Sequence, residues 1–187
     1  MGRKAIENGL TKEMIIEEAD KQFLHNDFSK VSMRSIASAL GFSHGAIYYH
    51  FENKTELFKA VIEKYFMILN HMLDEVTQYS KIEGTKKLFL GFIMFGLNNQ
   101  SQYNFMFVQR DGFIDPLALE APRACLKKYV ETLLQLHDHT LDETDLHATF
   151  ISLHGFVLYY KGRVDCYEDA KPAAEHFIEF LLKTLLP

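Results

Sequence analysis

The chain has few of the residues that mark disulfide scaffolds or zinc sites. Only two of its 187 residues are cysteine, and Cys125 and Cys166 lie 41 positions apart, without the paired spacing of a zinc site. Its first residues show no signal-peptide pattern. We therefore expect no disulfide framework and a cytoplasmic location.

Long apolar runs and catalytic motifs are also missing. The uncharged stretch 88–109 is long enough to cross a bilayer, but six Asn, Gln and Ser residues interrupt it between positions 98 and 104. This predicts two core helices broken near Ser101 and no membrane partner. The sequence has no Gly-rich phosphate loop, no nucleophile elbow and no His-Glu zincin motif. We therefore expect no enzyme, no catalytic residue, no resident metal and no cofactor.

The charge balance at first argues against a nucleic-acid partner. The formal net charge is −5 and the isoelectric point is about 6.0. The acidic excess lies wholly after residue 55, because residues 1–55 hold seven Lys and Arg against seven Asp and Glu. A neutral segment can bind DNA when its positive side chains share one face, and a dimer doubles the phosphate contacts. The composition therefore does not exclude a DNA-binding protein.

What the sequence does contain is helical periodicity in every long segment, without strand alternation or repeats. Ile15, Ala19 and Phe23 form the apolar stripe of a first helix. Another stripe runs from Leu57 to Val76 and predicts a long helix ending near Tyr79. These patterns predict an all-α protein.

Later helices are delimited by proline and by a capping pattern. Pro116 is expected to open a helix that runs to about Leu136, and Pro172 to lie in the first turn of a last helix ending near Leu186. Thr140 and Glu143 have the spacing of a capping box, which predicts a helix continuing to about Lys161.

The segment from Ser32 to Lys54 carries the most information. Met33, Ile36, Ala37 and Leu40 have helical spacing, with Ser32 before them as an N-cap. A glycine follows at position 41, where a left-handed conformation closes a helix. A second helix begins at once behind Ser43, which is again a favourable N-cap. The pattern predicts two short helices joined by a tight turn.

The second helix has two different faces. Ile47 and Phe51 are left to pack inward, whereas the other surface carries small residues, rings and hydrogen-bonding groups, namely Ser43, His44, Gly45, Tyr48 and Tyr49. A helix-turn-helix places such a surface in the major groove, and small residues let the backbone approach closely. Downstream, Asn53 is expected to cap a further helix that holds Lys54 in its first turn.

These residues resemble the signature of the TetR family of bacterial repressors. The match comprises Ile36-Ala37, Leu40-Gly41-Phe42-Ser43, Gly45, Ile47-Tyr48, His50-Phe51, Lys54 and Leu57-Phe58, with Phe28 and Val31 leading into it. It covers the first third of the chain. It implies an N-terminal three-helix DNA-binding domain over residues 1–55, followed by a helical effector-binding and dimerisation domain over residues 56–187.

The resemblance also implies roles for particular residues in DNA binding. Base edges in double-stranded DNA would be read by His44, Gly45 and Ala46, with Arg34 contacting a base or a phosphate. Phosphates would be held by Ser43, Tyr48, Tyr49, His50 and Lys54. The family's usual mode is repression of a palindromic operator by a homodimer, and no residue here excludes activation.

The second domain would carry two further surfaces. By resemblance, the last two helices form a dimer interface through Phe150, Leu153, Val157, Phe177, Phe180, Leu181 and Leu185. The resemblance also implies a small-molecule effector cavity, and the aromatic residues of the middle helices suggest its lining: Phe92, Phe95, Phe107, Arg110, Tyr129 and His154. For each of these residues the alternative is ordinary packing within one chain.

Two other functions remain open at this stage. The C-terminal histidines, His137, His139, His147 and His154, suggest a metal-sensing regulator, although no carboxylate or cysteine lies at ligand spacing. The helix-turn-helix pattern is also compatible with a helical adaptor that binds only proteins. Such an adaptor would show no salt-dependent DNA binding.

Overall fold

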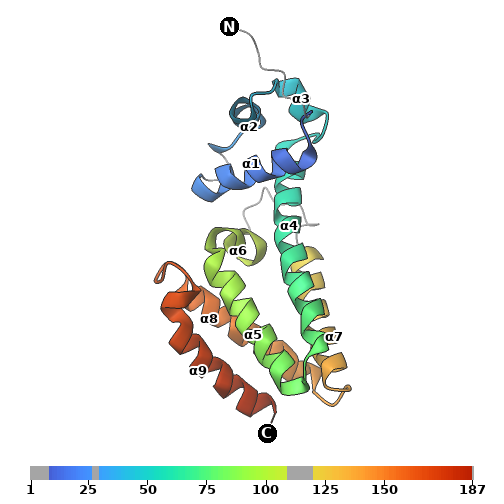
Figure 1. The fold of residues 1–187 in the computed structure, drawn as a ribbon, viewed down its shortest axis with the longest axis vertical. Coiled ribbons are helices and arrows are strands. Elements are labelled where there is room, and N and C mark those ends of the chain that lie inside the picture. Colours follow the sequence, from blue (N-terminus) through green and yellow to red (C-terminus); the bar gives the residue numbers. More distant parts are fainter. Residues whose placement is uncertain (1–8, 27–29, 109–119, 187) are drawn as a thin grey trace. The chain divides into compact units, whose positions relative to one another are not determined.

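A computed structural model describes residues 9–26, 30–108 and 120–186, and the regular secondary structure of this part of the chain is helical, without a β-strand (Figure 1). The all-α prediction is confirmed. The α-helices are α1 (Lys12–His25), α2 (Met33–Leu40), α3 (His44–Tyr48), α4 (Lys54–Glu75), α5 (Lys81–Asn98), α6 (Gln100–Phe107), α7 (Glu120–Leu136), α8 (Glu143–Tyr160) and α9 (Tyr167–Leu185), and a 3₁₀ turn, η2 (Val76–Gln78), follows α4.

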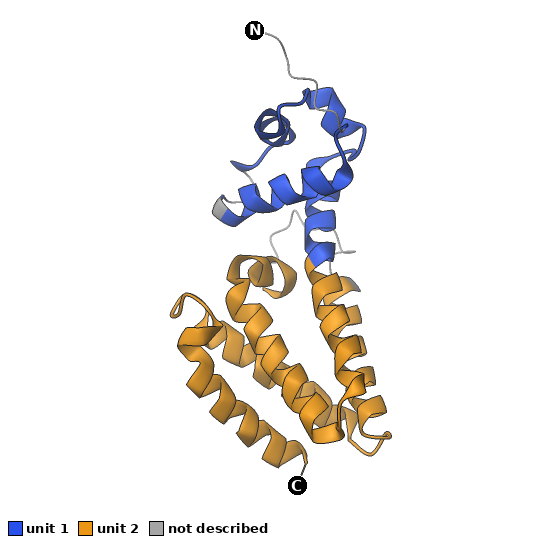
Figure 2. Ribbon diagram, viewed as in Figure 1, with its two compact units in different colours: residues 1–64 blue, residues 65–187 orange. Residues whose placement is uncertain are grey.

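The chain forms two compact units, residues 1–64 and residues 65–187 (Figure 2). The division falls within α4, because the first turns of this helix pack in the N-terminal unit. There the rings of Phe23 and Phe58 meet edge to face, with centroids 5.1 Å apart. Lys64 pairs with the largely buried carboxylate of Asp20 at 3.2 Å. The functional boundary expected between residues 55 and 56 stays a prediction.

The core of the N-terminal unit forms as its periodicity predicts. Ile15 and Ala19 of α1 are fully buried, as is Ile36 of α2. Ser35 links these two helices, because its Oγ lies 2.8 Å from Oε1 of Gln22. The stripe assigned to the first helix is thereby confirmed.

The turn between α2 and α3 is fixed by caps at both ends. Ser32 begins α2 by accepting a hydrogen bond from the Ser35 amide at 3.0 Å, and Ser35 accepts one from the Ser32 amide in return. Gly41 ends α2 in the left-handed region, with φ of 75°. Ser43 then caps α3 by accepting from the Ala46 amide. All three caps were predicted from the sequence.

We expect Gly41→Ala to destabilise the protein by about 1–2 kcal/mol, because the left-handed conformation brings a Cβ against the following carbonyl. Thermal unfolding measures the loss. Gly45→Ala is the matched control, since this helical glycine has no positive φ and no atom within 4 Å of an added Cβ. Equal melting temperatures for the two variants would contradict the assignment.

In the C-terminal unit, α5 packs against α7, α8 and α9. Gly96 permits the close approach of α5 to α8, because a Cβ at this position would lie 2.6 Å from Cγ1 of Val157. Leu88, Phe89 and Ile93 of α5 are fully buried in the resulting core. Among the described residues, no helix is both long enough and apolar enough to cross a membrane.

Two predicted helix starts in this unit are wrong. Asp142, and not Thr140, caps α8 by accepting from the Thr144 amide at 2.7 Å, while the Thr140 hydroxyl donates to the His137 carbonyl. The last helix begins at Tyr167, so Pro172 lies inside it. The earlier start is stabilised by Asp169, whose carboxylate accepts from the Cys166 amide at 3.2 Å. Pro116 lies outside the described residues.

Candidate nucleic-acid interface

Helix α3 presents two faces of opposite character. Ile47 and the following Phe51 are buried, which fixes the orientation of the helix on the N-terminal unit. His44, Tyr48 and Tyr49 are exposed on its other side. The structure therefore brings together the side chains that the sequence placed on one surface.

The small residues at the start of α3 leave its backbone open. An added Cβ at Gly45 would meet no atom within 4 Å, and the neighbouring Ala46 is half-buried. The Ser43 hydroxyl accepts from the Ala46 amide at 3.3 Å and keeps its own proton as a donor. The main chain at the start of α3 can therefore approach the base edges in a groove of DNA closely.

Two ring pairs organise the aromatic side chains. His44 and Tyr48, one turn apart, meet edge to face with centroids 4.8 Å apart. Tyr49 and the half-buried His50 do the same at 5.3 Å. Each pair places an imidazole beside a phenol ring in the segment 44–50, so both ring types are available there to a partner.

The two basic residues of the predicted interface differ in their surroundings. Arg34 is exposed in the first turn of α2 and has no ion-pair partner among the described side chains. Lys54 is half-buried, and its ammonium donates to the Val31 carbonyl at 3.0 Å. Burial lowers the pKa of Lys54. Lys54 thus ties the start of α4 to the segment before α2, a structural role that the sequence did not reveal.

The cap in front of Lys54 is confirmed. Asn53 accepts from the Glu56 amide at 2.9 Å, and the Glu56 carboxylate accepts from the Glu52 amide. The backbone from residue 52 to residue 56 is therefore ordered by side chains of its own segment. This order fixes the backbone position from which the Lys54 side chain extends.

The comparison with protein families decides the identity of this unit. Residues 15–61 match the profile of the family described as bacterial regulatory proteins, tetR family. This segment belongs to the TetR family. The matched segment covers most of α1, all of α2 and α3, and the start of α4. It includes the helix caps and the exposed surface described above.

Curated relatives are similar to this chain over a short stretch. A protein named "Probable acrEF/envCD operon repressor" from Escherichia coli K12 is 48% identical over 48 residues, which are 26% of this chain and 22% of that protein. The HTH-type transcriptional regulator TtgR of Pseudomonas putida is 34% identical over 62 residues, 33% of this chain and 30% of TtgR. The chain thus matches less than a third of the length of these relatives.

Solved structures share the whole TetR fold at low sequence identity. A transcriptional regulator of the TetR/AcrR family from Thermobifida fusca superposes with a TM-score of 0.74 at 18% identity, covering 91% of this chain and 96% of the other. NalD of Pseudomonas aeruginosa gives 0.70 at 21% identity, covering 93% and 96%. These likenesses show the fold of both units.

The residues predicted to line an effector cavity lie mainly in an aromatic cluster. Phe107 contacts Tyr103 and Phe150, with centroids 4.8 and 6.4 Å away, and Phe92 joins them. Tyr129 packs on Phe150 at 5.2 Å. Phe95 is buried outside this group of rings, against Tyr65. Arg110 lies outside the described residues.

Two polar side chains of the C-terminal unit are partly or wholly shielded from solvent. His154 accepts from or donates to the Tyr103 hydroxyl at 2.6 Å, and burial lowers its pKa. Asn70 on α4 holds a buried Oδ1 that has no hydrogen-bond partner among the described residues. A buried acceptor without a donor is unfavourable and suits a site that a ligand donor can complete. Asn70 was not predicted, and nothing in its sequence context distinguishes it.

The predicted dimer residues divide into two groups. The larger group packs within the chain's own core: Phe150, Leu153, Val157, Leu181 and Leu185 are all buried. Of the others, Phe177 is half-buried and stacks on Phe156, whereas Phe180 is 61% exposed. The structure therefore offers only the second group to a partner, because the first turns toward the interior.

The same two helices expose apolar residues that the sequence reading missed. On α8 these are Ile151, Leu158 and Tyr159, and Gly155 lies between them with open space around it. Their spacing of four, seven and eight residues places them on one helix face. This regular spacing was the available signal, but the equally regular buried stripe of Phe150, Leu153 and Val157 obscured it.

The C-terminal histidines are engaged in separate hydrogen bonds. His137 lies 2.8 Å from the Thr85 hydroxyl, and His147 lies 2.7 Å from the Glu143 carbonyl. The part of the chain that the structure describes contains no group of three or more His, Cys, Asp or Glu residues placed to hold a metal ion.

We expect acidification to destabilise the protein through His137. Burial, and secondarily the charge of Lys81, lowers the pKa of His137, so the folded state favours the neutral ring. Stability is then complete above the unfolded-state pKa of about 6.5 and falls as pH drops below it. Denaturant unfolding at several pH values measures this slope. The slope should be smaller in His137→Gln, which keeps a donor for Thr85. Wild-type stability that rises on acidification would contradict this prediction.

Proposed function

We propose that this protein is a DNA-binding transcriptional regulator that represses a palindromic operator as a homodimer and is released by a small-molecule effector. The single observation that carries the proposal is the exposed surface of α3, in a segment that matches the TetR family profile. Small residues and hydroxyl groups gather there, while the apolar side chains turn inward.

The proposed roles follow from position and chemistry. His44, Gly45 and Ala46 face base edges, and Arg34 contacts a base or phosphate from α2. Phosphates are bound by the hydroxyl groups of Ser43, Tyr48 and Tyr49, by His50 and by the Lys54 ammonium. The bond from Lys54 to Val31 orients this ammonium, so its loss would disturb both the local fold and the contact.

Dimerisation is proposed through the exposed apolar face of α8 and α9. Ile151, Leu158, Tyr159 and Phe180 are exposed in the single chain, and together they form a surface that a second copy can bury. A two-fold dimer presents two recognition helices about 34–36 Å apart, or a further turn of DNA apart, and therefore selects a palindromic site.

The names of several similar proteins support repression coupled to a ligand. NalD is described as the secondary repressor of a multidrug efflux pump, and another similar structure is a SmeT–triclosan complex. For this chain we propose that effector and operator are reciprocally linked. An effector that binds the DNA-free conformation more tightly must weaken operator binding by the same factor.

Selection from random duplex DNA by the purified protein tests this function. We expect a palindromic consensus with two half-sites whose centres lie about one or two helical turns apart. A Tyr48→Phe variant, which lacks only one hydroxyl, should select the same sequence with lower affinity, since a phosphate contact carries no sequence information. Recovery of unrelated sequences would overturn the proposal and favour the protein-binding adaptor.

A further inference from the structure

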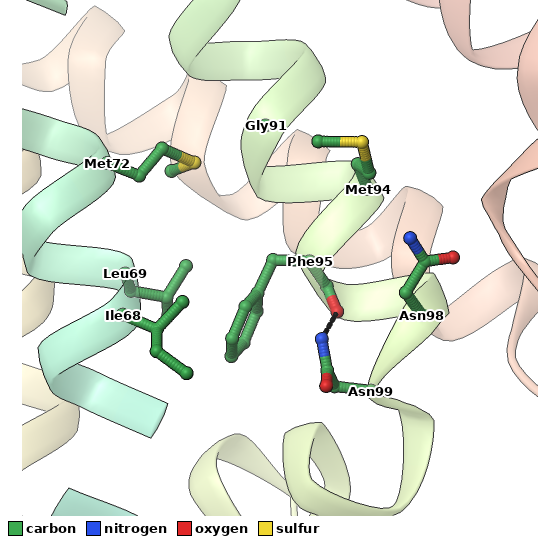
Figure 3. A pocket seen from close by; sticks show the side chains of 8 residues that line it. All are labelled: Ile68, Leu69, Met72, Gly91, Met94, Phe95, Asn98 and Asn99. Carbon is green, nitrogen blue, oxygen red and sulfur yellow. Dashed lines mark hydrogen bonds between the residues drawn. The ribbon is translucent and has the colours of Figure 1, made fainter. Parts of the chain in front are cut away.

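We propose that the cleft between α4 and α5 binds a small, uncharged, largely apolar molecule bearing one polar group that both donates and accepts hydrogen bonds. The cleft lies in the C-terminal unit and has a volume of about 260 Å³ (Figure 3). It is lined by Ile68, Leu69, Met72, Gly91, Met94, Phe95, Asn98 and Asn99. The identification of this molecule as the effector rests on the proposed function, whereas the proposal that it binds in the cleft does not.

The lining determines the charge of the ligand. Six of the eight residues are apolar, and the other two carry neutral carboxamides. A charged group placed here would lose hydration without gaining an ionic partner from the lining. The cleft therefore favours a neutral molecule.

The two carboxamides supply a donor and an acceptor at one side of the cleft. Asn98 accepts from the Tyr167 amide at 2.9 Å, which identifies its Oδ1 and leaves Nδ2 as a donor. Asn99 donates through Nδ2 to the Phe95 carbonyl at 2.9 Å, which leaves Oδ1 as an acceptor. Neither remaining atom has a hydrogen-bond partner among the described residues. Figure 3 shows both carboxamides across the cleft from Ile68 and Leu69.

The apolar side of the cleft can adapt to a ligand. Met72 packs against Gly91, where an added Cβ would collide with its sulfur atom. Methionine side chains repack at low cost around different ligand shapes. Ile68, 47% exposed, and the similarly exposed Met94 form an accessible rim. At about 30 Å³ per water molecule, the volume corresponds to about nine waters, or a ligand on the order of ten non-hydrogen atoms.

This cleft is separate from the aromatic cluster. Phe92 contributes to the cluster from α5, whereas Gly91, Met94 and Asn98 lie on a different face of the same helix. Of the described residues that were predicted to bind an effector, Phe95 alone lines the cleft. The proposal thus assigns ligand binding to residues that the sequence pattern did not select.

The test uses the full chain with ¹³C-methyl-labelled methionine and two probes of equal size, 4-phenylbutanamide and 4-phenylbutanoate. We expect the amide to shift the Met72 and Met94 methyl signals saturably, with a Kd below about 1 mM. The signals of Met14 and Met33 in the N-terminal unit should stay in place. The carboxylate should bind at least about tenfold more weakly, since its charge loses hydration in the cleft.

Three variants test the geometry of the site. Ile68→Phe fills the rim and should weaken amide binding at least about tenfold, whereas Met67→Phe, at a residue 69% exposed that does not line the cleft, should leave it unchanged. Asn98→Asp keeps the acceptor for Tyr167 but removes the donor, and should weaken binding about fivefold or more.

The proposal is overturned if the wild type shows no saturable shift at Met72 and Met94. Equal binding of the carboxylate, or wild-type affinity in a folded Ile68→Phe protein, would also overturn it. If Ile68→Phe loses the dispersed Met14 and Met33 signals of the folded state, Met94→Phe fills the same cleft from α5 and replaces it. No readout involves DNA, so failure here is distinct from failure of the proposed function.

Discussion

Gly45→Leu is expected to lower operator affinity about 100-fold or more while leaving the protein folded. The free protein has no atom within 4 Å of a Cβ at Gly45, so the larger side chain meets no obstacle before DNA binds. In the groove it would hold the backbone of α3 away from base edges. Each lost contact costs about 1–3 kcal/mol, and two half-sites double the loss.

Folding and binding must be measured separately for this variant. Leucine is a better helix former than glycine by about 0.8 kcal/mol, so thermal stability should be equal or higher. Gly45→Ala, with one added methyl group, should bind DNA with intermediate affinity. Unchanged operator affinity in the folded leucine variant would show that α3 does not enter the groove at Gly45.

The double substitution Ile151→Glu and Phe180→Glu is expected to convert the dimer to a monomer and to abolish operator binding with it. Both side chains are exposed, at 68% and 61%, so a carboxylate at either position remains hydrated in the single chain. In a dimer, these carboxylates would be buried without partners at a cost of several kcal/mol. Sedimentation measures the change in mass, and circular dichroism confirms that the helices persist.

Ile82→Glu is the matched control for this prediction. Ile82 is 65% exposed and lies in the first turn of α5, on a different helix from the residues of the proposed interface. This variant should remain a dimer with full operator affinity. A dimeric double variant, or a monomer that still binds the palindrome tightly, would contradict the assigned interface.

The N-terminal unit could be predicted almost completely because its signals are local. Ser32, Gly41 and Ser43 act on residues within one turn, and the structure places each as the sequence indicates. The contact that the sequence did not predict is a long-range one. The bond from Lys54 to Val31 joins residues 23 positions apart, and no local pattern encodes it.

The C-terminal unit was harder to predict from the sequence because its helices are apolar on more than one face. On α8, Leu153 and Val157 are buried, while Ile151 and Leu158 on another face are exposed. Periodicity alone cannot say which face meets the chain's own core. Two helix starts were also predicted wrongly. Asp142 caps α8 in place of Thr140, and Asp169 stabilises a start of α9 that lies before Pro172.

The most direct test of the account is binding of the purified protein to DNA upstream of its own gene across a series of salt concentrations. We expect tight binding at low salt. The logarithm of the association constant should fall linearly with the logarithm of the salt concentration, with a slope of about −0.9 for each phosphate neutralised. Gly45→Leu should lose the sequence-specific part of this binding. Failure to bind this or any selected DNA, even at low salt, would contradict a DNA-binding regulator.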